Sequence, residues 1–310
     1  MSKGIAMQKK NRLRDVLKKL DTKQMDESTY LIIGKNNGTF PYSNSLLIVD
    51  EEVVLIDSGI GDEQINVLKD EIDILINSHY HIDHILGNYI FSELWVVEQE
   101  AEVTSSFDNY KRFAGISGTK IEDNWLGWFH QYFKFHASSP TKTFKPNEVF
   151  KFGETEWRAV HTPGHSPGHC CFYEPNKRIM FSSDLDLTSF GPWYGNPNAN
   201  LPDFIESIKK LSNSKMDVIA TSHTLPLLEG IPEALEDYLN IIYKREEQIL
   251  ELLKKEKSVS ELEANNIIYK EEQKGYEAFA WFEQKMLKKH LDRLIESEKV
   301  EKIGDKYKVL

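Results

Sequence analysis

The segment N-S-H-Y-H-I-D-H-I-L-G-N, residues 77–88, holds three histidines and an aspartate within six positions, although the whole chain has only ten histidines. These residues are His79, His81, Asp83 and His84, and an apolar run precedes them. If that run is a strand, His79 and His81 can both project to one side of the turn that follows it. Asp83 and His84 then start a helix and aim the other way. Imidazole and carboxylate suit Zn²⁺, Fe or Mn²⁺, so the spacing predicts one loop that supplies ligands to two metal ions.

Two metal ions need more ligands than this loop holds, and three later segments offer them. They are H-T-P-G-H-S-P-G-H at 161–169, S-S-D-L-D at 182–186 and T-S-H-T at 221–224. Each follows or flanks a strand-like run, so we expect all three at the same edge of a sheet. Asp57 ends the run V-V-L-I-D and is placed to hydrogen-bond a ligand histidine from a neighbouring strand end.

Short apolar runs that end in Gly, Asn or Asp position these residues. From Tyr30 they are Y-L-I-I, S-L-L-I-V-D, E-V-V-L-I-D and I-D-I-L-I-N, which predict buried strands with tight turns. Strand signals resume at E-W-R-A-V-H-T, H-C-C-F-Y, R-I-M-F-S and D-V-I-A-T, with an amphipathic helix in D-F-I-E-S-I-K-K-L. Two strand-rich halves with intervening helices predict a layered α/β core with helices outside.

The sequence pattern of the C-terminal part, residues 231–310, is mainly helical. It predicts one long helix at Glu233–Lys257, a second helix capped by Ser258 or Ser260, and a third at Glu277–Ser297. A G-D turn between two short strands then predicts a hairpin. The order helix, helix, hairpin indicates a winged-helix-like domain, which we interpret as a lid or a homodimerisation element.

Residues 107–140 interrupt the rhythm of strands and are rich in aromatic side chains. An inserted cap over a pocket and plain core packing both fit this pattern. As a cap, the segment would line an apolar cleft and favour a small-molecule substrate with an apolar part. The side chains that would do so are Trp125, Trp128, Phe129, Tyr132 and Phe133.

The net charge of −11 is unevenly distributed along the 310 residues. Residues 1–27 carry +4 and predict a solvated basic helix or loose arm, and residues 231–310 carry −3, which leaves −12 for the middle. An acidic middle disfavours nucleic acid as a partner, and bound cations would offset part of the charge.

Other features of the chain bear on location and redox state. No window reaches the ~18 consecutive apolar residues of a membrane span, and the basic N-terminus lacks a signal-peptide core, so we expect a cytoplasmic protein without a membrane partner. The only cysteines, Cys170 and Cys171, are adjacent and indicate no disulfide framework.

Five motifs in order resemble those of the metallo-β-lactamase superfamily. H-Y-H-I-D-H matches its H-x-H-x-D-H signature, and T-P-G-H-S-P-G, F-S-S-D and T-S-H match its second, third and fourth motifs. L-I-D-S-G matches the upstream motif. The resemblance covers residues 28–230 and implies a four-layer αββα sandwich for this catalytic domain, with a small helical, winged-helix-like domain after it.

The resemblance also implies a ligand set. The first metal would be held by His79, His81 and His165, the second by Asp83, His84 and His223, with Asp184 bridging. Asp186 competes for the bridging place, but the alignment of F-S-S-D favours Asp184. One departure is Ser183, where many members have Gly, and it leaves the ligands intact.

Histidines outside the motifs are interpreted as structural. These are His130, His136, His161 and His290. His169 begins a strand and is a weaker candidate for a residue behind the ligands.

The implied mechanism is hydrolysis by a hydroxide that two divalent metal ions activate. Zinc is the preferred metal, and iron and manganese are the alternatives. We expect an acyl ester, thioester or lactone as substrate. Asp83 is the candidate proton acceptor. Tyr194 is either a donor to the developing oxyanion or part of the loop packing.

Two other activities remain open from the sequence. A metal-dependent endoribonuclease would need a basic track leading to the site, whereas the C-terminal part is slightly acidic. A mononuclear iron persulfide dioxygenase would use the same first-metal ligands, but the complete second set disfavours it. His81 argues against the flavoprotein-linked di-iron branch, which usually has Glu there.

Overall fold

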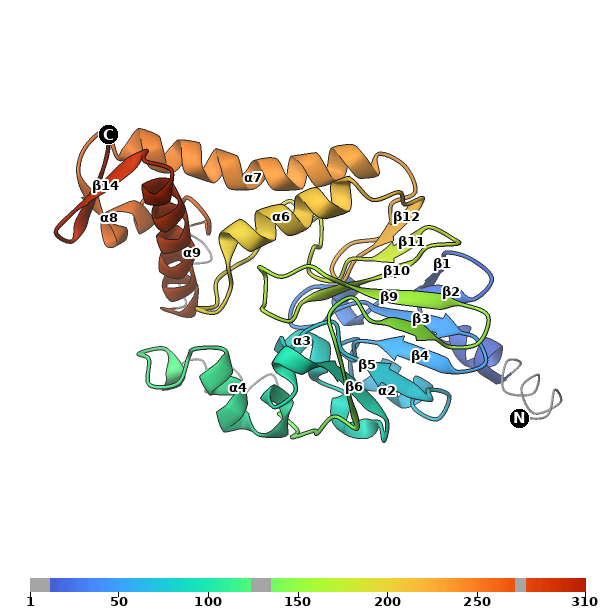
Figure 1. The fold of residues 1–310 in the computed structure, drawn as a ribbon. Coiled ribbons are helices and arrows are strands. Elements are labelled where there is room, and N and C mark those ends of the chain that lie inside the picture. Colours follow the sequence, from blue (N-terminus) through green and yellow to red (C-terminus); the bar gives the residue numbers. More distant parts are fainter. Residues whose placement is uncertain (1–11, 124–134, 271–276) are drawn as a thin grey trace.

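Two β-sheets pack face to face with helices on their outer sides, as Figure 1 shows. The computed structural model describes residues 12–123, 135–270 and 277–310. The predicted fold class, a mixed α/β sandwich followed by C-terminal helices, is confirmed. The aromatic side chains predicted to form a cap, residues 125–133, lie outside the described residues.

The first sheet has seven strands in sequential order. They are β1 (Thr22–Gln24), β2 (Thr29–Ile32), β3 (Ser45–Val49), β4 (Val53–Ile56), β5 (Ile74–Ile76), β6 (Leu94–Val97) and β7 (Lys142–Phe144). Strands β1 to β4 run antiparallel, and β4 to β7 run parallel. The parallel strands β4 and β5 therefore deliver their carboxyl ends to the same edge of the sheet.

The second sheet has five strands in the order β12-β11-β10-β9-β8. They are β8 (Val149–Lys151), β9 (Glu156–His161), β10 (Cys170–Glu174), β11 (Ile179–Phe181) and β12 (Val218–Ala220). Only the pair β11 and β12 is parallel.

Alternating side chains divide each sheet between two cores. In β4, Val54 and Ile56 face the second sheet, whereas Val53 and Leu55 face the outer helices. In β10, Phe172 lies between the sheets and Cys171 faces outward. Period-two alternation in strands buried on both faces produces the four layers α, β, β, α.

Helices cover the outer face of each sheet. On the first sheet they are residues 12–17 and α2 (Asp62–Leu68), and on the second α6 (Leu201–Ser212) and α7 (Ile231–Leu252). Two further helices, α3 (Ile82–Ile85) and α4 (Phe107–Phe113), lie beyond the strand ends of the first sheet.

The described residues before the domain boundary predicted at residue 28 pack against the first sheet. Leu13 and Leu17 are buried in the outer core of the first sheet, and β1 pairs with β2. The described part of the predicted arm, residues 12–27, therefore belongs to the sandwich. The strand T-K-Q in β1 is polar and exposed on one edge, so it carries no apolar signal.

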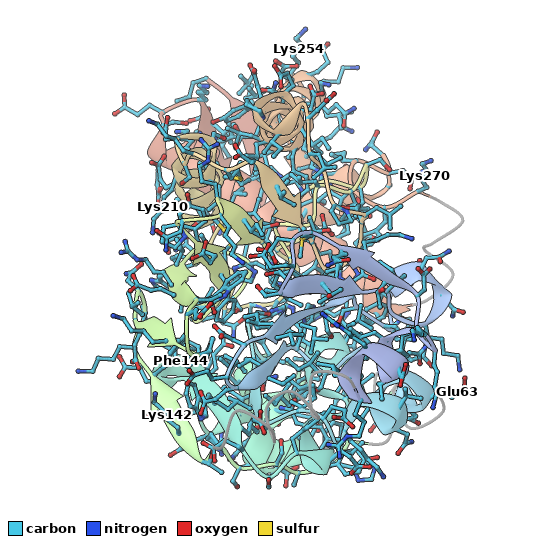
Figure 2. The ribbon with its side chains drawn as sticks, turned by 90° about the vertical axis from the view of Figure 1, so that its right-hand side faces the viewer. Glu63, Lys142, Phe144, Lys210, Lys254 and Lys270 are labelled. Carbon is cyan, nitrogen blue, oxygen red and sulfur yellow. The ribbon has the colours of Figure 1, made fainter. Side chains whose placement is uncertain are left out.

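The C-terminal unit follows α7 and contains α8 (Val259–Glu263), α9 (Glu277–Glu296) and a three-stranded sheet. Its strands are β13 (Lys257–Ser258), β14 (Val300–Ile303) and β15 (Lys306–Val309). Ser258 caps α8 through a reciprocal capping box with Glu261. The predicted hairpin is β14–β15, and the winged-helix assignment stays a prediction. Figure 2 shows Lys254 of this unit at the opposite end of the molecule from Lys142 of β7.

No helix among the described residues is long and apolar enough to cross a membrane.

Candidate metal centre

The loop after β5 carries four of the candidate ligands. His79 and His81 lie between the strand and α3, and Asp83 and His84 lie within α3. All four side chains are buried. The short helix turns the last two residues toward a different direction from the first two, as the spacing predicted.

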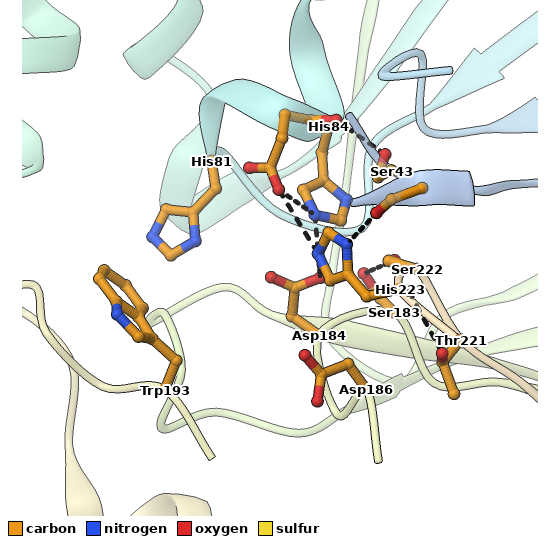
Figure 3. A network of polar contacts seen from close by, with 12 residues as sticks. Ser43, His81, His84, Ser183, Asp184, Asp186, Trp193, Thr221, Ser222 and His223 are labelled. Atoms are coloured by element: carbon orange, nitrogen blue, oxygen red, sulfur yellow. Dashed lines mark hydrogen bonds and ion pairs between the residues drawn. The ribbon is translucent and has the colours of Figure 1, made fainter. Parts of the chain in front are cut away.

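Three strand ends of the second sheet supply the remaining candidates. His165 follows β9, Asp184 follows β11 and His223 follows β12. Figure 3 shows His84, Asp184 and His223 converging. Asp83, which follows the first sheet, has its Oδ2 3.5 Å from His223 Nε2. The centre therefore lies where the edges of the two sheets meet.

The seven residues form two groups that share Asp184. Within each group the potential ligand atoms all lie within 4.8 Å of one another. One group contains His79, His81, His165 and Asp184, and the other contains Asp83, His84, Asp184 and His223. Asp184 Oδ2 is 3.1 Å from His165 Nε2, and Asp184 Oδ1 is 2.9 Å from His84 Nε2. Each oxygen of this carboxylate thus faces a different group, which is the arrangement of a bridging ligand.

Two buried atoms at the centre have no hydrogen-bond partner among the described residues. They are His84 Nε2 and Asp184 Oδ1, which lie close together but lack hydrogen-bond geometry. Burying such atoms without a partner is costly, at about 1–3 kcal/mol each. A divalent ion between them would satisfy both, and nitrogen and oxygen donors in these numbers fit zinc, iron or manganese.

Hydrogen bonds on the outer ring nitrogens orient three of the histidines. His84 Nδ1 donates to Asp57 Oδ2 at 2.8 Å, His165 Nδ1 to the Trp193 carbonyl at 2.8 Å, and His223 Nδ1 to the Gly38 carbonyl at 2.6 Å. Each bond places a ring proton on Nδ1 and leaves Nε2 facing the centre. The sequence predicted this role for Asp57, which also accepts from the backbone N–H of Ser78.

Burial and charge set the protonation of the cluster. Burial lowers the pKa of His79 and of His81 well below the ordinary value, so both imidazoles are neutral. Burial opposes ionisation of Asp184, but the imidazoles of His84 and His223 outweigh it and hold its pKa well below the ordinary value. Burial also opposes the charged form of His223, but Asp184 outweighs it and raises the pKa of that imidazole to about 9. A divalent cation that binds here would therefore take the place of a proton beside an ionised carboxylate.

The family model for the metallo-beta-lactamase superfamily matches residues 38–223. The chain belongs to this superfamily. The resemblance of the five motifs is thereby confirmed.

Two solved structures share the fold over nearly the whole chain. The metallo-beta-lactamase family protein TTHA1429 from Thermus thermophilus aligns with a TM-score of 0.70 at 20% identity, covering 93% of this chain and 100% of that one. A beta-lactamase domain protein from Burkholderia ambifaria aligns with a TM-score of 0.72 at 20% identity, covering 94% of both chains. This coverage extends the shared fold beyond the catalytic sandwich into the C-terminal unit.

Curated relatives match over shorter stretches. The acyl-coenzyme A thioesterase MBLAC2 of Bos taurus is 26% identical over 179 residues, which is 52% of this chain and 63% of the relative. The probable hydroxyacylglutathione hydrolase glo2 of Schizosaccharomyces pombe is 30% identical over 125 residues, 39% of this chain and 37% of the relative. The atrochrysone carboxyl ACP thioesterase of Aspergillus fumigatus is 22% identical over 231 residues, 71% of this chain and 62% of the relative. The matches thus span less than two thirds of each of these three relatives.

Ser183 precedes the candidate bridging residue Asp184 and has a backbone conformation that favours glycine. Its φ is +51°, in the left-handed region that favours glycine. In this chain the serine hydroxyl lies 2.7 Å from Ser78 Oγ, which itself donates to Asp57. The side chain thus links the two sheets behind the ligands and offsets part of the backbone cost.

Two residues support the candidate ligands from behind, and the sequence pointed weakly to one of them, His169. His169 Nε2 accepts from the backbone N–H of Asp184 at 3.3 Å, and burial lowers the pKa of this imidazole to about 3. Glu100 accepts from Ser166 Oγ at 2.6 Å and from Gly168 N at 2.8 Å, both in the loop that carries His165. His169 sits in the motif H-S-P-G-H, from which it was named as a weaker candidate, whereas Glu100 has no local signal and was not predicted.

Tyr194 has two alternative roles in the sequence analysis, and its contacts bear on the choice between them. Its side chain is fully buried, and its hydroxyl lies 2.6 Å from His290 Nε2 and accepts from Arg245 Nη1 at 3.0 Å. The hydroxyl is therefore bound to α7 and α9, an arrangement that favours loop packing over the alternative role as an oxyanion donor. Its loop still reaches the centre through Trp193, whose carbonyl holds His165.

The remaining polar candidates have structural roles. Asp186 accepts from the backbone N–H of Thr188 and belongs to neither ligand group. His161 contacts the Pro167 carbonyl, and His136 stacks on Tyr89. His130 lies outside the described residues.

Proposed function

We propose that this protein is a hydrolase of thioesters that uses two divalent metal ions, zinc in the first place. The observation that carries the proposal is the carboxylate of Asp184, whose two oxygens face two separate sets of ligand atoms. The names of the relatives support the substrate class, since acyl-coenzyme A thioesterase, hydroxyacylglutathione hydrolase and acyl carrier protein thioesterase all act on thioesters.

The ligand roles follow from the two groups. The first ion would be held by His79, His81 and His165, the second by Asp83, His84 and His223, with Asp184 shared. When bound, such ions lower the pKa of a water molecule and polarise an acyl carbonyl.

Asp83 is the proposed proton acceptor for the attacking water. Its Oδ2 lies 3.6 Å from His84 Nε2 and 3.5 Å from His223 Nε2, so the carboxylate borders the reaction centre. Burial and the nearby charge of Asp184 raise the pKa of Asp83 above its ordinary value. A carboxylate with a raised pKa is a better base than a solvated one.

Positioning falls to residues behind the ligands. Asp57 holds His84, and the Trp193 carbonyl holds His165, so the imidazoles need no reorientation during turnover. Such pre-organisation lowers the cost of reaching the transition state.

The experiment combines metal analysis with a substrate panel. Protein purified without added metal is analysed for zinc, iron and manganese, and then assayed on an aryl ester, an acyl thioester, a lactone, a persulfide and a short RNA. The proposal expects two divalent ions per chain and turnover of the thioester. One iron per chain with oxygen uptake on the persulfide would indicate the dioxygenase instead. RNA cleavage with an inert thioester would indicate the nuclease.

Asp184→Asn and Asp186→Asn form a matched pair for the bridging role. The two residues are two positions apart and have the same side chain, but only Asp184 belongs to the ligand groups. Asp184→Asn should lose bound metal and activity, and Asp186→Asn should keep its metal content. Equal metal loss in both variants would remove the main support for a shared carboxylate.

A further inference from the structure

One face of α9 borders the metal centre. Phe282 packs edge-on against Trp193 at 5.3 Å between ring centroids, and Trp193 packs against His81 at 5.5 Å. Two turns further along, Lys289 Nζ donates to the Asn196 carbonyl at 2.8 Å. The amide of Asn196 in turn contacts His81 Nε2 at 2.6 Å. The loop that carries Trp193 and Asn196 ends at the start of α6, and Figure 1 shows α9 beside this point.

Lys285 lies on the same face as Lys289, four residues earlier. Both side chains are half-buried, and Lys285 Nζ lies 4.8 Å from the centre of the Trp281 ring. Residues at this spacing are neighbours on a helix surface, so two like charges there repel each other. Burial and the charge of Lys285 lower the pKa of Lys289 to about 8.

Neither lysine forms an ion pair within the described parts of the chain. Other basic residues of the C-terminal unit do: Arg293 pairs with Glu246, and Lys306 with Glu261. The charge of the exposed Asp292 acts on Lys289, but the lowered pKa of Lys289 shows that burial and the charge of Lys285 outweigh it. Two half-buried ammonium groups side by side without an ion pair are unfavourable. This cost lies where the helix meets the metal centre, and an anionic ligand bound there would offset it.

We propose that Lys285 and Lys289 bind an anionic group on the thiol half of the substrate. The proposal rests on the thioester hydrolase proposed above and names the class of thioester, one whose thiol carries phosphate or carboxylate groups. Coenzyme A carries phosphates and glutathione carries carboxylates whatever the acyl group, and an ammonium can bind either anion. Lys289 uses one of its three donors on Asn196, so two remain for the anion.

Calorimetric binding of ligands that cannot be hydrolysed tests the site without relying on activity. Desulfo-coenzyme A and S-methylglutathione keep the anionic groups but have no free thiol to ligate metal, and they also separate phosphate from carboxylate. The variants are Lys285→Gln and Lys289→Gln, because glutamine removes the charge while its amide can still donate to Asn196. Lys288→Gln is the matched control, since Lys288 is on the same helix but exposed.

We expect each of the two variants to weaken binding of the preferred ligand about tenfold, and more at low salt, as for a partly buried charged hydrogen bond. Lys288→Gln should bind within about twofold of the unmodified protein, as exposed charges contribute little. Hydrolysis of an uncharged N-acetylcysteamine thioester should be unchanged in Lys288→Gln, which shows that a charge change on this helix alone does not disturb the metal centre. The inference is overturned if neither ligand binds, or if the variants bind as tightly as the unmodified chain.

The two proposals fail in different ways. If thioesters are hydrolysed but the lysine variants show no loss with anionic thiols, the function stands and the lysine site is wrong. If the anionic ligands bind with the expected lysine dependence but no thioester is hydrolysed, the anion site stands and the proposed function is wrong.

Discussion

Removing the hydroxyl of Tyr194 would show whether this residue has a catalytic or a structural role. We consider the variant Tyr194→Phe, which removes only the oxygen atom. That oxygen is fully buried and serves two partners, His290 Nε2 at 2.6 Å and Arg245 Nη1 at 3.0 Å. Arg245 keeps its bonds to the carbonyls of Pro192 and Phe190 in the variant, so the loop loses one of its attachments to α7.

The magnitude follows from what the variant leaves behind. A buried charged N–H and a buried ring nitrogen each lose a partner, and such losses cost about 1–3 kcal/mol of unfolding free energy. The activity should stay within about twofold, because the variant leaves the ligands and the Trp193 carbonyl in place. An oxyanion donor, by contrast, would contribute about 10²–10³-fold to kcat.

Urea unfolding and steady-state hydrolysis of the thioester, both on metal-loaded protein, measure the two effects. Tyr173→Phe is the control, since its hydroxyl makes one bond to the Lys215 carbonyl in an exposed setting. That control should change stability by less than about 0.5 kcal/mol. A hundredfold fall in kcat for Tyr194→Phe with unchanged stability would refute the structural role and restore the oxyanion donor.

Two further predictions concern residues behind the ligands. Asp57→Asn weakens the partner of His84 Nδ1, so we expect metal affinity to fall about 10–100-fold in competition with a chelator; unchanged affinity would show that the Asp57 bond does not orient the ligand. Burial raises the pKa of Glu100 from 4.5 to about 7, so the folded protein holds a proton that the unfolded chain releases, and stability is lost as pH rises between these values. Glu100→Gln does not titrate, and its unfolding free energy relative to the unmodified protein should rise by about 3 kcal/mol from pH 4.5 to pH 8, as measured with urea. A difference independent of pH would contradict the raised pKa.

Local chemistry made much of this fold predictable. The strands that contain Val54 and Phe172 are apolar runs that end in turn residues. The capping box of α8 needs only Ser258 and Glu261, which lie within four consecutive positions. The candidate metal ligands were equally predictable, since each lies in a short motif at a strand end. In these cases the physical cause of the structure is contained in a few consecutive residues.

Other features depend on contacts between distant segments. β1 is a polar strand that pairs only because β2 offers a free edge, so its sequence T-K-Q carries no signal of its own. Tyr194 is polar and near the candidate bridging residue Asp184 in sequence. Its hydroxyl nevertheless contacts Arg245 of α7 and His290 of α9, which are 51 and 96 positions away. Glu100 supports the loop of His165 from 66 positions before Ser166. No pattern within a local window contains these pairings.

The division of the ligands between the two sheets has a consequence for folding. His84 belongs to the first sheet and His223 to the second, and a bound ion would join them across 139 residues of chain much as a covalent cross-link would. Cross-links that close long loops restrict the unfolded chain strongly, and a ligand that binds only the folded state adds stability that grows with the logarithm of its concentration relative to Kd. Metal supply in the cell would then set how much of the protein is folded as well as how much is active. A chelator would then lower the free energy of unfolding of this chain as well as its activity.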